Sequence, residues 1–111
     1  MGIGIPIDRE RLAQFCRKHH IRTLSFFGSV LGDDFRPDSD VDVLYELEPG
    51  HRIGGYFDLI RVEEELSGLL QRHRVEMVEP RYLNRWIKDQ VLSEAQVQYG
   101  KKLQSYAGNL T

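Results

Sequence analysis

Residues 40–45 have the alternating pattern of a β-strand, and two of them, Asp40 and Asp42, are acidic. Asp40 and Asp42 alternate with Val41 and Val43, and a period of two places alternate side chains on one face of a strand. Both carboxylates should therefore point to the same side, about 6–7 Å apart at the backbone. Because two like charges on one face repel each other, the pattern favours a bound cation over an exposed strand face.

The kind of cation follows from the ligands that the sequence offers. A calcium loop starting at Asp38 would need Gly at its sixth position and Glu at its twelfth, where this chain has Val43 and Pro49. The four histidines show no zinc-ligand spacing with one another or with Cys16. Oxygen ligands alone favour Mg²⁺ or Mn²⁺, and Mg²⁺ usually binds one or two carboxylates together with substrate phosphates. The carboxylate pair therefore indicates a nucleotide.

A phosphate site is expected at Gly28 and Ser29. These residues follow a predicted strand, Ile21–Phe27, and precede a segment with room for one helical turn over Ser29–Leu31. Backbone N–H groups at such a turn are unpaired, and glycine lets a phosphate approach them closely. The Gly-x-x-x-x-Gly-Lys pattern of a Walker loop does not occur in the chain. The Gly-Ser pair gains its meaning from the Asp-Val-Asp motif that follows ten residues later.

Hydrophobic periodicity predicts the remaining elements and a single domain over residues 1–111. A helix is expected after an N-cap at Asp8. The other predictions are a helix over Tyr56–Gln71, strands at Val75–Val78 and Gln96–Tyr99, and a last helix from Pro80 that buries Leu83, Trp86, Ile87, Val91 and Ala95. This order predicts an α/β or α+β fold, a small mixed sheet flanked by helices. The polar tail 101–111 is expected to fray.

Composition limits the classes of function. Fifteen Lys and Arg against seventeen Asp and Glu give a formal net charge of −2, which makes a nucleic-acid partner unlikely on electrostatic grounds. The turn over residues 72–74 and the pair His19 and His20 are expected to be solvated. A single cysteine, the lack of a signal-peptide pattern and the lack of a long apolar run predict a cytoplasmic protein without membrane contact.

The segment SFFGSVLGDDFRPDSDVDVLYEL resembles the signature of polymerase-beta-like nucleotidyltransferases, and in particular of the minimal nucleotidyltransferase (MNT) proteins. The resemblance covers most of the chain and implies the polymerase-beta-like nucleotidyltransferase fold. It also implies that Gly28 and Ser29 bind the nucleotide, ATP. In the same way it implies that Asp40 and Asp42 are catalytic residues that hold Mg²⁺ or Mn²⁺.

The family pattern includes a third carboxylate on a later strand, usually an aspartate, and Glu76 in HRVEMVEP occupies that place. Alternation puts Glu76 on the face opposite Val75 and Met77, as an active-site carboxylate requires. Glutamate is a departure from the family, and its longer arm shifts the carboxylate by about a bond length, a change that can cost ~100-fold in rate. Glu76 is therefore expected to act as a base or metal ligand, or to mark weakened catalysis.

The resemblance further implies a partner, because MNT proteins commonly act beside a small helical protein of the HEPN type. In one subset the MNT protein is an antitoxin that transfers AMP from ATP to a tyrosine of its HEPN toxin. This activity is the favoured interpretation, with the segment 82–95 and the tail from Lys101 as candidate contacts in a homo- or hetero-oligomer. The alternatives are a non-catalytic nucleotide-binding module that neutralises the partner by occlusion, and a transferase that acts on a small molecule or, less favoured, on an RNA end.

Overall fold

The computed structural model describes residues 5–33 and 35–101. Four strands form one sheet in the order β3-β2-β1-β4. The strands are β1 (Ile21–Phe27), β2 (Val41–Leu47), β3 (Val75–Val78) and β4 (Gln96–Tyr99). β1 is antiparallel to β2 and β4, whereas β2 and β3 run parallel. The sheet is therefore mixed, as the sequence predicts, and the expected fold class is confirmed.

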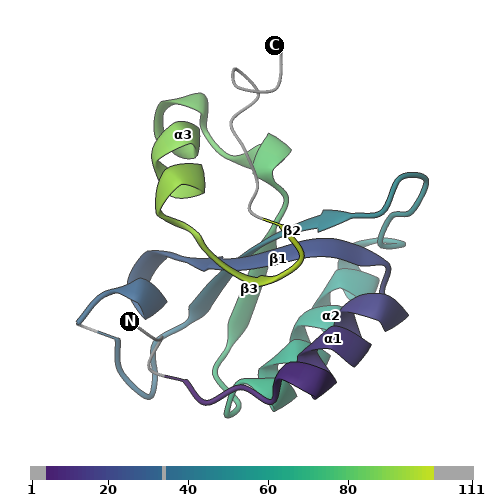
Figure 1. Cartoon of the computed structure of the whole chain (residues 1–111), viewed down its shortest axis with the longest axis horizontal. Coiled ribbons are helices and arrows are strands. Elements are labelled where there is room, and N and C mark those ends of the chain that lie inside the picture. The colour runs from purple at the N-terminus through teal and green to yellow at the C-terminus, as the bar shows by residue number, and fades with distance from the viewer. Residues whose placement is uncertain (1–4, 34, 102–111) are drawn as a thin grey trace.

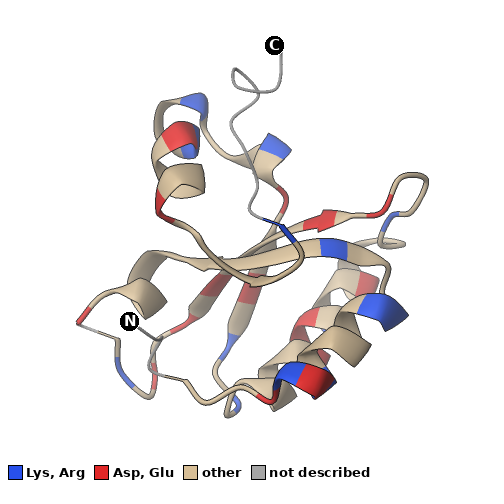
Figure 2. Cartoon of the chain, viewed as in Figure 1, with Lys and Arg blue, Asp and Glu red and all other residues tan. Residues whose placement is uncertain are grey.

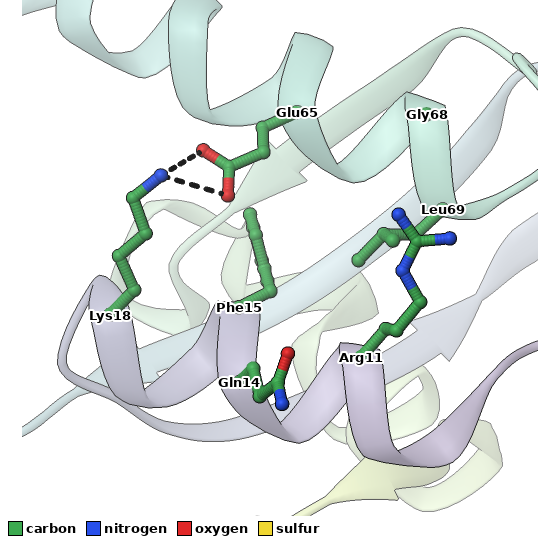
Figure 3. A pocket seen from close by; sticks show the side chains of 7 residues that line it. All are labelled: Arg11, Gln14, Phe15, Lys18, Glu65, Gly68 and Leu69. Carbon is green, nitrogen blue, oxygen red and sulfur yellow. Dashed lines mark hydrogen bonds and ion pairs between the residues drawn. The ribbon is translucent and has the colours of Figure 1, made fainter.

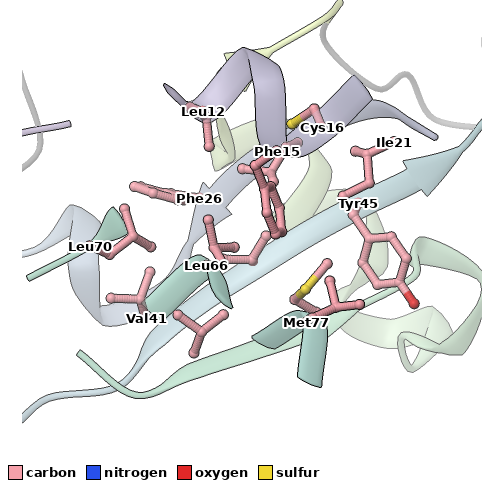
Figure 4. Packing of buried hydrophobic residues seen from close by; sticks show 14 of the residues in the cluster. Leu12, Phe15, Cys16, Ile21, Phe26, Val41, Tyr45, Leu66, Leu70 and Met77 are labelled. Atoms are coloured by element: carbon pink, nitrogen blue, oxygen red, sulfur yellow. The ribbon is translucent and has the colours of Figure 1, made fainter. Parts of the chain in front are cut away.

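Two helices, α1 (Arg9–Lys18) and α2 (Tyr56–Leu69), cover one face of this sheet (Figure 1). The Asp8 side chain caps α1 by accepting hydrogen bonds from the backbone N–H groups of Glu10 and Arg11, as predicted. The main core lies between these helices and the sheet (Figure 4), and its members include Leu12, Phe15, Phe26, Val41, Tyr45, Leu66, Leu70 and Met77. Because β2 uses its valines for this core, its aspartate faces the opposite side of the sheet.

The segment after β3 differs from the prediction of one helix that begins at Pro80. A short 3-10 turn, η2 (Pro80–Tyr82), comes first, and α3 (Arg85–Glu94) begins after Asn84. The Asn84 side chain accepts a hydrogen bond from the backbone N–H of Trp86, which is the N-cap arrangement that starts a new helix. α3 lies on the face of the sheet opposite α1 and α2 (Figure 1).

The predicted buried face of this last helix is wrong at two positions. Trp86 is 79% exposed and Ile87 is 48% exposed, whereas Leu92 and Ala95 are buried against Leu44 of β2. Apart from Leu44, the apolar side chains that border this small cluster are only partly buried, namely Phe27, Leu83 and Val91. The apolar cluster on this face is thus small, and the Trp86 ring lies outside it.

The polar tail that the sequence predicts to fray lies, from Lys102 onward, outside the described residues. Within the part of the chain that is described, no helix is long and apolar enough to cross a lipid bilayer.

Candidate active site

The register of the sheet brings two of the predicted site residues side by side. Asp42 on β2 lies directly opposite Glu76 on the parallel strand β3, and Phe27, the last residue of β1, lies opposite Asp42 on the other side. Paired residues of neighbouring strands point to the same face of a sheet. Figure 2 shows these acidic segments next to each other on β2 and β3. The prediction that Glu76 faces away from Val75 and Met77 is borne out, because Glu76 is exposed and both neighbours are buried.

Asp40 immediately precedes β2, which begins at Val41. Burial raises the pKa of Asp42, and the nearby charges of Glu76 and Asp40 raise it further. Among the described residues, none of the three carboxylates forms an ion pair with a basic side chain. The site therefore carries concentrated negative charge that no ion pair within the described part of the chain compensates.

Gly28 lies against this charge at the end of β1. Its φ of +77° is in the left-handed region, and a Cβ added there would lie 2.5 Å from Oδ2 of Asp42. The positive φ favours glycine, and a Cβ at this position would push the Asp42 carboxylate aside. Gly28 opens the short 3-10 turn η1 (Gly28–Leu31), and the Ser29 hydroxyl donates to the carbonyl of Asp40 at 3.3 Å. The structure thus places Gly28 and Ser29 next to Asp40 and Asp42.

The loop before β2 is tied to the turn before β3. The backbone N–H of Val41 donates to the carbonyl of Arg74 at 2.8 Å. Nδ1 of His73 lies 3.0 Å from the carbonyl oxygen of Ser39. Arg72 and Arg74 are exposed, as predicted for this turn, whereas His73 is only partly exposed and packs against the loop before β2. The sequence carries no signal for this contact, because a histidine in a polar turn looks the same whether or not a distant loop packs on it.

The donor set suits a hard divalent cation, but only with help from a ligand. All three side chains offer carboxylate oxygens, which Mg²⁺ and Mn²⁺ prefer. Among residues 5–33 and 35–101, no three His, Cys, Asp or Glu side chains lie in a group that could hold a metal ion, so Asp40, Asp42 and Glu76 do not form such a group by themselves. A cation here would need further oxygens from phosphate or water, and that is the usual state of Mg²⁺ beside a nucleotide.

A hollow lies between α1 and α2, away from the carboxylates (Figure 3). Lys18 and Glu65 form an ion pair at its rim at 3.1 Å. The partly buried His19 also contacts Glu65, at 3.0 Å, so the prediction that His19 is solvated is wrong. Because these charges already have partners and the hollow lies on the other face of the sheet, it is not a second part of the candidate active site.

Comparison with known proteins shows the family of the chain. The sequence profile of the family described as polymerase beta, nucleotidyltransferase, matches residues 10–104. The chain belongs to this family and is accordingly a nucleotidyltransferase. The resemblance expected from the Gly-Ser and Asp-Val-Asp motifs is confirmed.

Individual relatives fall in the same class. A protein of Methanocaldococcus jannaschii, provisionally named a protein adenylyltransferase, is 28% identical over 87 residues, which are 78% of this chain and 89% of the relative. A solved structure described provisionally as a minimal nucleotidyltransferase is 38% identical, covers 78% of this chain and 85% of its own, and superposes with a TM-score of 0.60.

Toxin–antitoxin structures share the fold at lower identity. One such structure with AMP-PNP has a TM-score of 0.65 and 14% identity, and covers 86% of this chain and 76% of that one. Another contains a tri-AMPylated Shewanella oneidensis HEPN toxin in complex with an MNT antitoxin, with a TM-score of 0.53, 16% identity and coverage of 84% and 70%. At these identities the likeness concerns the fold alone.

Proposed function

We propose that this protein transfers AMP from ATP to a tyrosine hydroxyl of a helical HEPN-type toxin and acts as its antitoxin. The observation that carries the proposal is the register that sets Asp42 beside Glu76, with Asp40 and the Gly28-Ser29 turn next to them. Two relatives lend support by their descriptions, namely the M. jannaschii protein and the complex of an AMPylated toxin with its antitoxin.

Each group has a defined part in the proposed reaction. The Gly28-Ser29 turn binds the outer phosphates through backbone N–H groups and the Ser29 hydroxyl. The tyrosine oxygen attacks the α-phosphorus of ATP while the bond from that phosphorus to the bridging oxygen breaks. AMP stays on the tyrosine and pyrophosphate leaves. Glu76, on the exposed face of β3, accepts the phenolic proton.

Asp40 and Asp42, with Glu76, are the residues that would hold a divalent cation, Mg²⁺ or Mn²⁺. Such an ion would supply positive charge against the phosphates and the developing negative charge of the transition state. The lack of ion pairs at these carboxylates among the described residues supports this role, and so does the raised pKa of Asp42, which burial raises first and the charges of Glu76 and Asp40 raise further.

The test is co-expression with a helical HEPN-type partner, followed by intact-mass spectrometry of the partner. The wild-type protein should add ~329 Da per transferred AMP, a covalent change that the mass of the partner reports directly. The double variant Asp40→Asn with Asp42→Asn should remain folded and leave the partner mass unchanged, because an amide is a poor ligand for Mg²⁺.

A matched control variant removes two negative charges at other positions of the same loop. Asp33 and Asp38 are both exposed, and Asp33→Asn with Asp38→Asn should modify the partner as the wild type does. Modification by the Asp40 and Asp42 double variant at the wild-type rate would refute the assignment of the site.

Two observations favour a second candidate function, occlusion without catalysis. Glu76 stands where the family usually has aspartate, and the described residues contain no complete metal-ligand group. In this case the toxin would be neutralised by binding alone. A growth assay separates the two functions, because an occluding module would protect the host fully with both aspartates replaced and with an unmodified partner.

A further inference from the structure

The turn between α2 and β3 adopts a costly backbone conformation. Gln71 and Arg72 have φ values of 59° and 63°, and two successive residues other than glycine in the left-handed region are uncommon. Such conformations persist where the surrounding structure holds them, and they cluster at functional sites. Here the Arg72 backbone N–H donates to the carbonyl of Ser67 at 2.9 Å, which anchors the turn to the end of α2.

The result of this turn is the position of His73. Its carbonyl accepts a hydrogen bond of 2.6 Å from the Ser67 hydroxyl. Its ring packs on Phe35 with 4.8 Å between the ring centroids. Nδ1 lies 3.0 Å from the carbonyl oxygen of Ser39, and because a carbonyl can only accept, Nδ1 must be the donor. The imidazole thus packs on Phe35 and donates a hydrogen bond to Ser39, and both of these residues lie in the loop before β2.

The contact matters because of its place in the chain. Ser39 is the residue before Asp40, and the next residue, Val41, donates its N–H to the carbonyl of Arg74. Asp40 is therefore held on both sides by hydrogen bonds to residues 73 and 74. Removing the imidazole would free the first of these two attachments and leave the second in place.

We propose that His73 is a positioning residue that holds Asp40, and with it the Asp40 carboxylate, close to Asp42 through its hydrogen bond to Ser39. The inference depends on the proposed function in one respect, the assumption that these carboxylates take part in the reaction. Displacement of a reacting or ligating group by about 1 Å can cost ~100-fold in rate, so a contact that fixes Asp40 bears directly on the reaction.

The first test needs no ligand. Hydrogen exchange, followed by mass spectrometry of peptides that span residues 36–41, compares wild type, His73→Ala and His73→Asn. Asparagine is the conservative variant, because its amide nitrogen can replace Nδ1 as a donor near the backbone. His73→Ala should exchange about tenfold faster in this segment with β1 unchanged, and His73→Asn should return the rate to within about threefold of wild type.

The matched control is His51→Ala, which removes an exposed histidine that stacks on His20 with 3.8 Å between the ring centroids. His51 follows the far end of β2, where Ile21 pairs with Leu47, so its loss should leave the exchange of residues 36–41 unchanged. Unchanged exchange in His73→Ala, or no restoration in His73→Asn, would overturn the proposal.

The second test measures the Mg²⁺ concentration that gives half-maximal binding of AMP-PNP. His73→Ala should raise it at least fivefold and His73→Asn less than twofold, with His51→Ala unchanged. If the wild type binds and His73→Ala binds equally well, the positioning role is wrong. If the wild type itself does not bind, the proposed function is wrong, and the hydrogen-exchange result decides on His73 alone.

Discussion

At the scale of residues, the ionised carboxylate of Asp42 lowers the stability of the fold, although the proposed function needs it. Burial and the charges of Glu76 and Asp40 raise its pKa, so the folded protein binds its proton more tightly than the unfolded chain does. Stability from this carboxyl is therefore fully present below its unfolded pKa and is lost as the pH rises through the folded pKa. At neutral pH and without a cation, the ionised side chain destabilises the fold.

Asp42→Asn tests this conflict in protein freed of metal by a chelator. The variant should be more stable than wild type at pH 7, by about 0.5 kcal/mol after allowance for solvent screening, which corresponds to a rise in Tm of about 2–4 °C. The difference should shrink as the pH falls through the carboxyl range. Thermal unfolding across pH measures it, and a variant that is less stable than wild type at pH 7 would contradict the account.

At the scale of elements, α3 depends on a few contacts with the sheet. Leu92 is 4% exposed and packs with Leu44 and Ala95, whereas Trp86 on the same helix is 79% exposed. Leu92→Ala should lower the free energy of unfolding by about 2–3 kcal/mol, the low end for buried leucine because the cluster is small. Trp86→Ala should change it by less than about 0.5 kcal/mol. Urea unfolding of both variants provides the comparison, and equal losses of stability in the two variants would contradict the assigned buried and exposed faces.

The same helix shows where sequence patterns stop predicting structure. Periods of two and of 3.6 predict the other helices and the strands β1 to β3 to within about two residues, because each of these buries an apolar stripe. β4 also lies where it is predicted, although none of its residues is buried. In the segment after β3, apolar residues lie on both sides of the helix, so the pattern cannot say which side is covered. The Asn84 cap was a usable signal for the start of α3, whereas the preceding Pro80 favoured an earlier start.

The sequence predicts one part of the candidate site, and another part is seen only in the structure. Asp40 and Asp42 are candidate site residues by residue type and strand alternation, which are local properties, whereas Glu76 is a candidate through the resemblance to the family pattern. The contact of His73 with Ser39 joins residues that are 34 positions apart, and it depends on the parallel pairing of β2 with β3. No single-sequence pattern reports such a pairing, so this part of the site required the structure.

At the scale of the whole molecule, the two faces of the sheet have separate tasks. α1, α2 and the main core occupy one face, and α3 lies on the other (Figure 1). Asp42 and Glu76 also face the side of α3, because their neighbours along β2 and β3 are buried in the main core. Stability therefore comes mainly from the first face, which leaves the second free to carry the uncompensated charge of the site. This arrangement lets a substitution at the carboxylates change binding without unfolding the chain.

The most direct test of the metal-bridged site is the Tm of the wild-type protein with AMP-PNP, in the presence of Mg²⁺ or of excess chelator. A ligand at 100 times its Kd stabilises a fold by about 2.7 kcal/mol, so the account predicts a rise of several degrees with Mg²⁺ or Mn²⁺. It predicts almost no rise with chelator, and none in the variant Asp40→Asn with Asp42→Asn. The Asp33→Asn with Asp38→Asn control should respond as the wild type does. Equal stabilisation by AMP-PNP in excess chelator would contradict the account.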